Sequence, residues 1–308
     1  MTTVPNFSLR QLGYLVAVAD HGSMTAAAEA IHVSQASISV AVNDLERRLG
    51  AQLMVRHPGY GISLTEAGAD VVADARRVLA AASDLYSAAR SPGHDLHGQL
   101  ALGCFSTIAP LFVPPLYETF AREHPAVRLD VTEGGQEDLC RLVLTGKCEM
   151  ALTYGNDLVA GLQTKIISRL RPYVLLAADH RLAKQEAINL HDLKGEPLIV
   201  YTKRPSPSNA ERILSDAGVP YEVGYSSENI EVVRALVGRG IGWTILLQKW
   251  PSTSIDGLPL AAVPLYNAPT TYNVVVIWST GSTLSPRSAA VVEVLRSVAR
   301  GLEAGAPT

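Results

Sequence analysis

The sequence predicts an α/β protein that carries an all-α winged helix-turn-helix at its N-terminal end. Three observations support this fold class. Residues 1–65 contain two short helices joined by a tight turn, a third helix and a small β-wing. Residues 66–90 form one long amphipathic helical pattern. From residue 99 onward, short apolar runs alternate with helical patterns, and this alternation predicts a parallel sheet covered by helices.

The helix-turn-helix is defined by its capping residues. Ser23 is a suitable N-cap for a helix over residues 25–31, whose alanines allow another helix to approach closely. The chain then turns at residues 32–33, and Ser34 caps a second helix over residues 35–49. These signals predict two helices at the close spacing of a DNA-binding motif.

The second of these helices has one apolar face and one small, polar face. Ile38, Val42, Leu45 and Leu49 recur at spacings of four, three and four, as a buried helix face requires. Small polar side chains at the start of an exposed helix are suited to contact base edges in the major groove. The predicted DNA-contacting residues are Ser34, Gln35, Ser37, Ser39, Val40, Arg47, Arg56 and His57.

The charge of this region gives no support to DNA binding. Residues 1–65 hold four arginines and four acidic residues, so their net charge is zero. The excess of basic residues that usually marks a DNA-binding domain is therefore absent. Arg47, Arg48 and Arg56 are candidates for local phosphate contacts. Alternatively, Arg47 and Arg48 are solvated residues at a helix end, where the helix dipole favours them. His57 in the wing contacts DNA or only solvent.

The helical pattern over residues 66–90 has a strict heptad. Its apolar positions are separated by four and three residues in turn, and they are Val71, Ala75, Val78, Ala82, Leu85 and Ala89. This repeat predicts a seam between two chains; the alternative is that the helix packs on its own domain. Ser91-Pro92-Gly93 ends the pattern, and residues 91–98 are predicted to form a hinge.

The remainder of the chain alternates strands and helices. The predicted strands are residues 99–104, 127–133, 148–154, 172–178, 197–202, 221–227, 241–246 and 272–278. The predicted helices are residues 111–122, 137–144, 208–216, 230–237 and 287–301.

The chain resembles the LysR-type transcriptional regulators over essentially its whole length. The segments LRQLGYLVAVADHGSMTAAAEAIHVSQASIS, LERRLGAQLMVR and LTEAG carry the resemblance, and QLALGCFSTIAP and ENIEVVRALVGRGIGWTIL extend it. Three positions depart from the family pattern: this chain has Ala36 where the family often has proline, Val40 where it often has arginine, and Met54 where it usually has phenylalanine. The loss of the arginine removes an expected phosphate or guanine contact, so the operator sequence cannot be inferred from relatives.

The resemblance implies a particular organisation of the C-terminal part. The last strand and helix are expected to return to a first subdomain, which gives a two-lobed periplasmic-binding-protein-like (type 2) α/β domain over residues 99–308. The expected subdomains are residues 99–165 plus 270–308, and residues 166–269.

A small-molecule effector is expected in the cleft between the lobes, because open α/β sheets bind ligands at the carboxyl ends of their strands. Ser106 and Thr107 follow the first strand and precede a helix, where hydroxyls and free N–H groups suit an organic anion. They serve as the effector's anchor or as simple N-caps. Trp243 is either an apolar wall or a core residue. The full set of predicted effector contacts is Ser106, Thr107, Gly135, Thr202, Ser226 and Trp243.

The family resemblance implies a regulator that binds double-stranded promoter DNA, responds to an effector and forms homodimers, commonly homotetramers. The competing hypothesis is a transport-type receptor for small molecules without DNA function, which leaves residues 1–90 unexplained. No motif of a hydrolase, zinc protease or P-loop enzyme occurs, so we expect neither catalysis nor a cofactor. No signal peptide is recognisable, and no apolar stretch approaches the roughly 18 residues of a membrane span. We therefore expect a cytoplasmic protein.

Three cysteines, Cys104, Cys140 and Cys148, are an odd number without metal-type spacing. Cys140 and Cys148 lie where a helix ends and a strand begins, so a redox switch is one interpretation. The other interpretation, small buried hydrophobic residues, agrees better with their positions.

Overall fold

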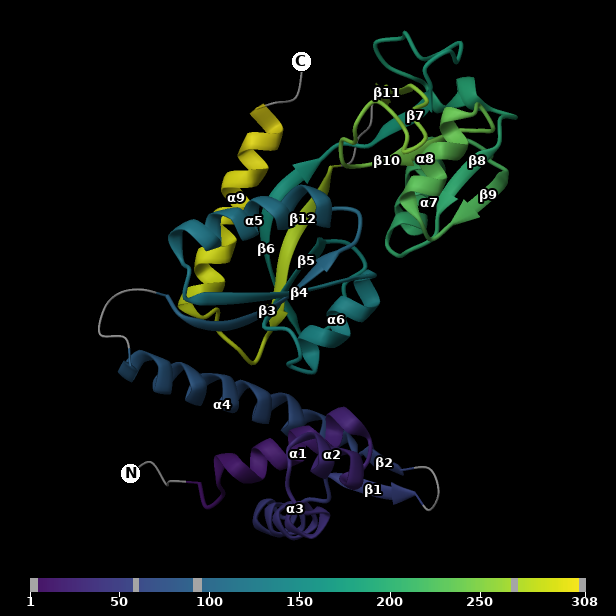
Figure 1. The fold of residues 1–308 in the computed structure, drawn as a ribbon. Helices are drawn as coiled ribbons and strands as arrows, with labels where there is room; N and C mark the ends of the chain where they lie inside the picture. Colours follow the sequence, from purple (N-terminus) through teal and green to yellow (C-terminus); the bar gives the residue numbers. More distant parts are fainter. Residues whose placement is uncertain (1–4, 58–60, 91–95, 267–270, 305–308) are drawn as a thin grey trace.

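The computed structural model describes residues 5–57, 61–90, 96–266 and 271–304. Within these ranges the chain forms an N-terminal helical domain, a long helix and a two-lobed α/β domain (Figure 1). The wing tip, most of the predicted hinge and the expected lobe boundary at residues 269–270 lie outside the described residues. None of the described helices combines the length and apolarity needed to span a bilayer.

The N-terminal domain has the predicted helix-turn-helix and wing. Helix α1 (Leu9–His21), whose bounds the sequence pattern did not give, precedes α2 (Met24–Ala30) and α3 (Gln35–Leu49). The side chains of Ser23 and Ser34 accept backbone N–H groups and cap α2 and α3 as predicted. His32 adopts a left-handed φ of 56° at the tight turn. The wing is the antiparallel pair β1 (Met54–His57) and β2 (Gly61–Leu64).

This domain has its own hydrophobic core, which extends into the long helix α4 (Glu66–Arg90). Leu15, Ile38 and Leu45 are fully buried there together with Val72 of α4. Gly68 marks the closest approach, because a Cβ at that position would lie 1.9 Å from the carbonyl oxygen of Leu53. The start of α4 is therefore an integral part of the N-terminal domain.

The first lobe is built on a mixed sheet in the order β4–β3–β5–β12–β6. Its strands are β3 (Gly98–Phe105), β4 (Val127–Gly134), β5 (Met150–Tyr154), β6 (Leu162–Leu170) and β12 (Tyr272–Ser279). Its helices are α5 (Ala109–Glu123), α6 (Gln136–Leu144) and α9 (Pro286–Ala304). Strands β3, β4 and β5 are parallel as predicted, whereas β12 returns antiparallel to its neighbours β5 and β6.

Strand β6 corrects the expected subdomain boundary. It pairs with β12 as far as Leu170, so the first lobe continues past residue 165 before the chain crosses to the second lobe. The sequence pattern predicted no strand here, because polar and apolar residues are mixed along LQTKIISRL.

The second lobe contains two small sheets. Strand β7 (Tyr173–Ala177) lies between β10 (Thr244–Leu246) and β11 (Leu260–Pro264), antiparallel to both. Strands β8 (Leu198–Tyr201) and β9 (Val223–Ser227) are parallel, and an isolated bridge from Leu198 to Trp243 joins the two sheets. Helices α7 (Ser206–Asp216) and α8 (Ile230–Gly238) and the short helix η1 (Leu190–Leu193) complete the lobe.

Candidate functional site: a DNA-reading face and an interlobe pocket

Helix α3 presents an outward face of exposed side chains. Ala36, Ser37, Val40, Asn43 and Arg47 are all exposed along it, and they line a shallow open hollow. The Val40 side chain, at the centre of the face, is 69% exposed. We define these five residues as the outward face of α3; it is the surface that a partner can reach without unfolding the domain.

The polar residues at the start of α3 divide into two roles. Ser34 is fixed as the N-cap, because its hydroxyl accepts the Ser37 N–H at 3.1 Å and lies 2.7 Å from the Ser37 hydroxyl. Ser37 and Gln35 remain exposed. Ser34 is therefore committed to positioning the helix, whereas Gln35 and Ser37 are available for contacts outside the protein.

The wing holds its polar side chains beside α3. Arg56 Nη2 of β1 donates to the Ser39 hydroxyl at 3.0 Å, and His57 Nε2 lies 2.8 Å from the Ser63 hydroxyl. Ser39 is half-buried and supports Arg56, so it does not belong to the outward face where the helical pattern had placed it. Arg56 and His57 themselves are exposed.

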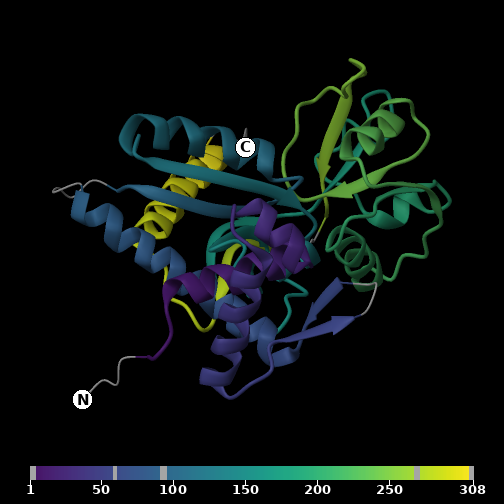
Figure 2. The same ribbon diagram turned by 60° about the horizontal axis from the view of Figure 1, so that its bottom comes forward.

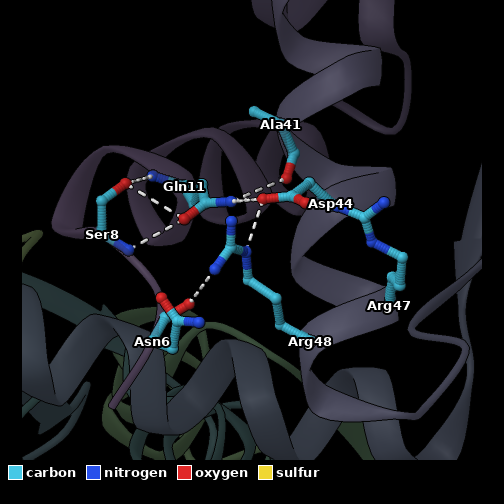
Figure 3. Close-up of polar contacts among 7 residues, drawn as sticks. All are labelled: Asn6, Ser8, Gln11, Ala41, Asp44, Arg47 and Arg48. Carbon is cyan, nitrogen blue, oxygen red and sulfur yellow. Dashed lines mark hydrogen bonds and ion pairs between the residues drawn. The ribbon is translucent and has the colours of Figure 1, made fainter. Parts of the chain in front are cut away.

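Asp44 organises the arginines at the end of α3 (Figure 3). Its carboxylate accepts from Arg48 Nε at 2.6 Å, from Gln11 Nε2 at 2.9 Å and from Arg47. The hydrogen bond from Arg48, together with those from Arg47 and Gln11, lowers the pKa of Asp44. Arg48 also donates to the Asn6 carbonyl at 2.8 Å, so it secures the N-terminal segment, whereas the Arg47 side chain stays 77% exposed.

Two other acidic residues of the domain, Glu46 and Asp20, are also engaged internally. Glu46 accepts the Leu53 and Met54 N–H groups at 2.7 and 3.1 Å and so anchors the wing. Asp20 pairs with Arg76 at 2.6 Å and Lys147 at 2.9 Å, outside residues 1–65. The net charge of the domain is zero, but its charges are unevenly placed. These acids stabilise the fold through internal contacts, whereas the positive charge of Arg56 lies exposed beside α3.

Two ion-pair networks attach helix α4 to the first lobe. Arg76 of α4 joins Asp20 of α1 to the Thr145 carbonyl at the end of α6, at 2.6 Å each. Further along, Arg287 of α9 is buried and pairs with Asp84 of α4 at 2.5 and 2.9 Å. Figure 1 shows α4 between the N-terminal helices and this lobe, and Figure 2 shows the end of α4 beside α9. The first lobe is thus linked to the N-terminal domain by direct contacts along α4.

The heptad of α4 is divided between two environments. Ala75 is 2% exposed and, with the half-buried Val71, packs on the core of its own N-terminal domain. Val78 and Leu85 are 44% and 75% exposed. The predicted seam between chains therefore excludes the first two heptad positions, which the N-terminal domain already covers; the side chain of Ala89 lies outside the described residues.

A pocket lies between the two lobes. The first lobe contributes only two residues to its lining, and the second lobe supplies β8, the first turns of α7 and the β10 region. The complete lining is Thr107, Tyr154, Leu198, Ile199, Val200, Tyr201, Ser206, Asn209, Ala210, Ile213, Ile230, Thr244, Ile245, Leu246, Leu247 and Gln248. Its free volume is about 30 Å³, which is room for roughly one water molecule.

Gln248 connects the lobes at this pocket. Its side chain accepts from the Tyr154 hydroxyl at 2.7 Å and donates to the Thr107 carbonyl at 3.2 Å, while its carbonyl accepts from Tyr173 at 2.7 Å. Burial raises the pKa of Tyr154 and of Tyr173. Both phenols are therefore neutral hydrogen-bond donors over the whole physiological pH range.

Direct bonds hold the lobes together around the pocket. Asn156 Nδ2 donates to Asn209 Oδ1 at 2.6 Å, Arg212 pairs with Asp157 at 3.2 Å, and the Gln136 N–H donates to the Arg204 carbonyl at 3.3 Å. A ligand larger than water can enter the pocket only when these contacts between the lobes break. The described state is accordingly a closed arrangement of the two lobes.

Known proteins match the chain from end to end. A model described as "Bacterial regulatory helix-turn-helix protein, lysR family" matches residues 9–69, and one described as "LysR substrate binding domain" matches residues 93–300. The chain belongs to the LysR family of transcriptional regulators. It is a DNA-binding regulator with an effector-binding domain, and the match over residues 9–69 accounts for the region that a transport-type receptor leaves unexplained.

Solved structures of LysR regulators resemble the chain over nearly its full length. HinK from Pseudomonas aeruginosa is 30% identical, with a TM-score of 0.63 over 96% of this chain and 99% of that one. A full-length single-residue variant of OxyR from Pseudomonas aeruginosa is 26% identical, with a TM-score of 0.74 over 96% and 98%. Full-length CbnR in complex with its target DNA is 25% identical, with a TM-score of 0.54 over 95% and 100%.

Of the six predicted effector contacts, the structure of this LysR regulator brings one to the interlobe pocket. Thr107 lines the interlobe pocket. Ser106 instead donates to the Gly134 carbonyl at 3.2 Å, and Gly135 is the N-cap of α6. Thr202 and Ser226 are exposed and do not line the pocket, although they lie on the predicted strand-end loops.

Trp243 is a core residue and not a pocket wall. It is 1% exposed, and its indole N–H donates to the Glu196 carbonyl at 3.1 Å beneath β8. Tyr154, Asn209 and Gln248 line the pocket, and the sequence had not indicated them. Tyr154 is the last residue of a predicted strand, so its position at a strand end could have indicated a site. No sequence pattern could have indicated Gln248 and Asn209, because their position at the pocket depends on how the two lobes pack together.

The cysteines of this LysR regulator lie in non-reactive environments. Cys104, Cys140 and Cys148 are buried and unpaired. Burial raises the pKa of all three thiols, that of Cys148 to about 11. Since the thiolate is the reactive form, the geometry supports small hydrophobic residues and gives no support to a redox switch.

Proposed function

We propose that the outward face of α3 enters the major groove of promoter DNA, with Gln35, Ser37 and Val40 at the base edges. Arg47, at the end of this face, and Arg56, beside it in the wing, contact phosphates. The observation that carries the proposal is the exposure of a helix face whose neighbouring acids, Asp44 and Glu46, are held in hydrogen bonds within the protein. The likeness to CbnR, solved with its target DNA, supports the same use of the domain.

The effector site is the interlobe pocket. A small molecule that binds between Thr107 and Asn209 replaces the direct bonds that close the lobes. It can shift the balance between lobe arrangements only by its difference in affinity for them. The change reaches DNA through the contacts of Arg76 and Arg287 with the first lobe, since these fix α4 and the domain that α4 carries.

Promoter recognition requires two copies of the chain. Val78 and Leu85 of α4 form an exposed apolar stripe, and two such helices bury it when they pair. The homodimer then presents two α3 helices to two half-sites, and pairs of dimers form the homotetramer. We place this activity in the cytoplasm, where the promoter DNA is.

The test is selection of bound fragments from random DNA by the purified full-length protein, followed by binding titrations with Gln35→Ala. Loss of a base contact weakens specific binding by about 1–3 kcal/mol and leaves binding to random DNA nearly unchanged. Ala69→Ser, at an exposed position where α4 begins and away from the outward face of α3, serves as a control on the same domain. Equal losses on selected and random DNA by Gln35→Ala would contradict a base-reading role.

A further inference from the structure

We infer that the ligand of the interlobe pocket is an uncharged small molecule, with a largely apolar body and a hydrogen-bond acceptor at one end. The inference rests on the proposed effector site and goes further by assigning the ligand's chemical class. It replaces the organic anion that the strand-end loops had suggested.

The lining of the pocket is the first line of support. Among the described residues that line it, nine are aliphatic and none is charged. A carboxylate or phosphate that enters loses its hydration and gains no cationic partner, which is a severe cost in a buried site. An apolar body gains free energy in the same place, because its burial removes apolar surface from water.

Two arginines at the edges of the lobes are committed elsewhere. Arg212 pairs with Asp157 and Arg204 lies 3.6 Å from Glu137, each on the rim between the lobes. Neither arginine lines the pocket. Moving one of them to an anionic ligand would leave a carboxylate of the first lobe without its partner.

The two helix starts at the pocket are also poorly suited to anions. Helix α5 begins just after Thr107, and α7 begins at Ser206, which lines the pocket. Helix N-termini bind anions through their free N–H groups. Both helices carry a proline in this first turn, Pro110 in α5 and Pro207 in α7, and proline has no N–H to donate.

Two buried polar atoms define the polar end of the ligand. Thr107 is 2% exposed and Asn209 is 3% exposed. Within the described part of the chain, neither Thr107 Oγ1 nor Asn209 Nδ2 has a partner with hydrogen-bond geometry, although the Tyr154 phenol lies close enough to the Thr107 side chain to interact with it. Unsatisfied buried groups of this kind are costly. A carbonyl or hydroxyl oxygen on the ligand accepts from a donor of this kind without bringing a charge.

The inference is tested with pairs of probes that share one skeleton and differ in charge. Cyclohexanecarboxamide is compared with cyclohexanecarboxylate, and hexanamide with hexanoate, by calorimetric titration of the full-length protein near neutral pH. We expect saturable binding of the amides and at least tenfold weaker binding of the carboxylates. Equal or tighter binding of the carboxylates, or no saturable binding of either amide, would overturn the inference.

Two variants locate the binding. Ala210→Phe fills the pocket from α7, whereas Ser215→Phe adds the same ring at an exposed position of that helix. We expect Ala210→Phe to abolish amide binding and Ser215→Phe to retain it. If the carboxylates bind and Ala210→Phe removes them, the effector site stands and the ligand class is wrong. If Ala210→Phe changes no binding, the proposed site itself is wrong.

The polar end is tested with Thr107→Val. This change keeps the side-chain shape and removes a hydroxyl that has no partner with hydrogen-bond geometry among the described residues, so the unfolding temperature of the ligand-free protein should not fall. Amide affinity should drop about three- to tenfold, as expected for one neutral hydrogen bond. An unchanged amide affinity would remove Thr107 from the ligand's polar end.

Discussion

The outward face of α3 and the interlobe pocket differ in how the chain makes them. The outward face of α3 comes from one continuous stretch, Ala36 to Arg47, and it is exposed before any partner arrives. The pocket gathers residues from Thr107 to Gln248 and is closed by bonds between its own walls. One site is therefore available at all times, and the other exists in a binding-competent form only when the lobes part.

This difference suits a regulator in which DNA binding is the constant activity and the ligand is the variable. The exposed face needs no rearrangement to meet a rigid duplex. The closed pocket makes ligand binding compete with bonds such as Asn156–Asn209 and Arg212–Asp157. Because the first lobe supplies one side of those bonds and also holds α4 through Thr145, opening the pocket and moving the DNA-binding domain are physically connected.

The largest expected effect comes from disrupting the proposed dimer, because this should abolish promoter binding by the outward face of α3 and leave ligand binding at the interlobe pocket unchanged. Val78→Asp places a charge in the proposed seam of α4, at a cost of several kcal/mol, on the order of 3. We expect a monomer in sedimentation, with promoter binding lost and amide binding at the pocket retained. Ala80→Asp, exposed on the same helix, is the control. A folded Val78→Asp protein of unchanged mass would contradict the proposed seam.

An intermediate effect is expected from Asp44→Asn. The neutral amide no longer competes with DNA phosphate for Arg47, whose side chain is 77% exposed. Binding to random DNA should tighten, and the salt dependence should steepen by about one phosphate contact, a slope change of roughly −0.9. An unchanged slope in titrations over a salt series would show that Arg47 lies away from the DNA backbone.

The smallest expected effect concerns the thiols. Cys148 has a pKa raised to about 11 by burial, so the neutral thiol dominates at neutral pH and the reactive thiolate appears only as the pH approaches 11. Alkylation of the native protein at neutral pH should be very slow, and hydrogen peroxide should leave promoter binding unchanged. Rapid labelling of a thiol in the folded protein would revive the redox interpretation.

Local signals predicted the DNA-binding region well. Ser23 and Ser34 define the starts of α2 and α3, because a capping hydroxyl acts within three residues of itself. The partner of the α4 heptad was harder to predict, because an apolar spacing of four and three residues does not show whether the helix packs on its own domain or on a second chain. Val71 and Ala75 face the chain's own core, and Val78 does not.

The pocket was largely beyond sequence reasoning. Thr107 was found because it follows a strand end, but Gln248 is 141 residues away along the chain from the carbonyl that it contacts. Trp243 fitted both a pocket wall and a core, since the two environments prefer the same side chain. Strand β6 was missed because it mixes polar with apolar residues, and β11 was missed because its alanines and its final proline are weak strand formers.

The central claim is that the outward face of α3 reads bases, and Val40 permits its most direct test. An exposed valine at the centre of a groove-entering helix is suited to a thymine methyl group. Thymines of the selected site are replaced singly by deoxyuridine, which lacks only that methyl, and binding is measured for wild type and Val40→Ser. We expect at least one position where deoxyuridine costs the wild type about 0.8 kcal/mol and costs Val40→Ser almost nothing. Equal costs for both proteins at every thymine would contradict the account.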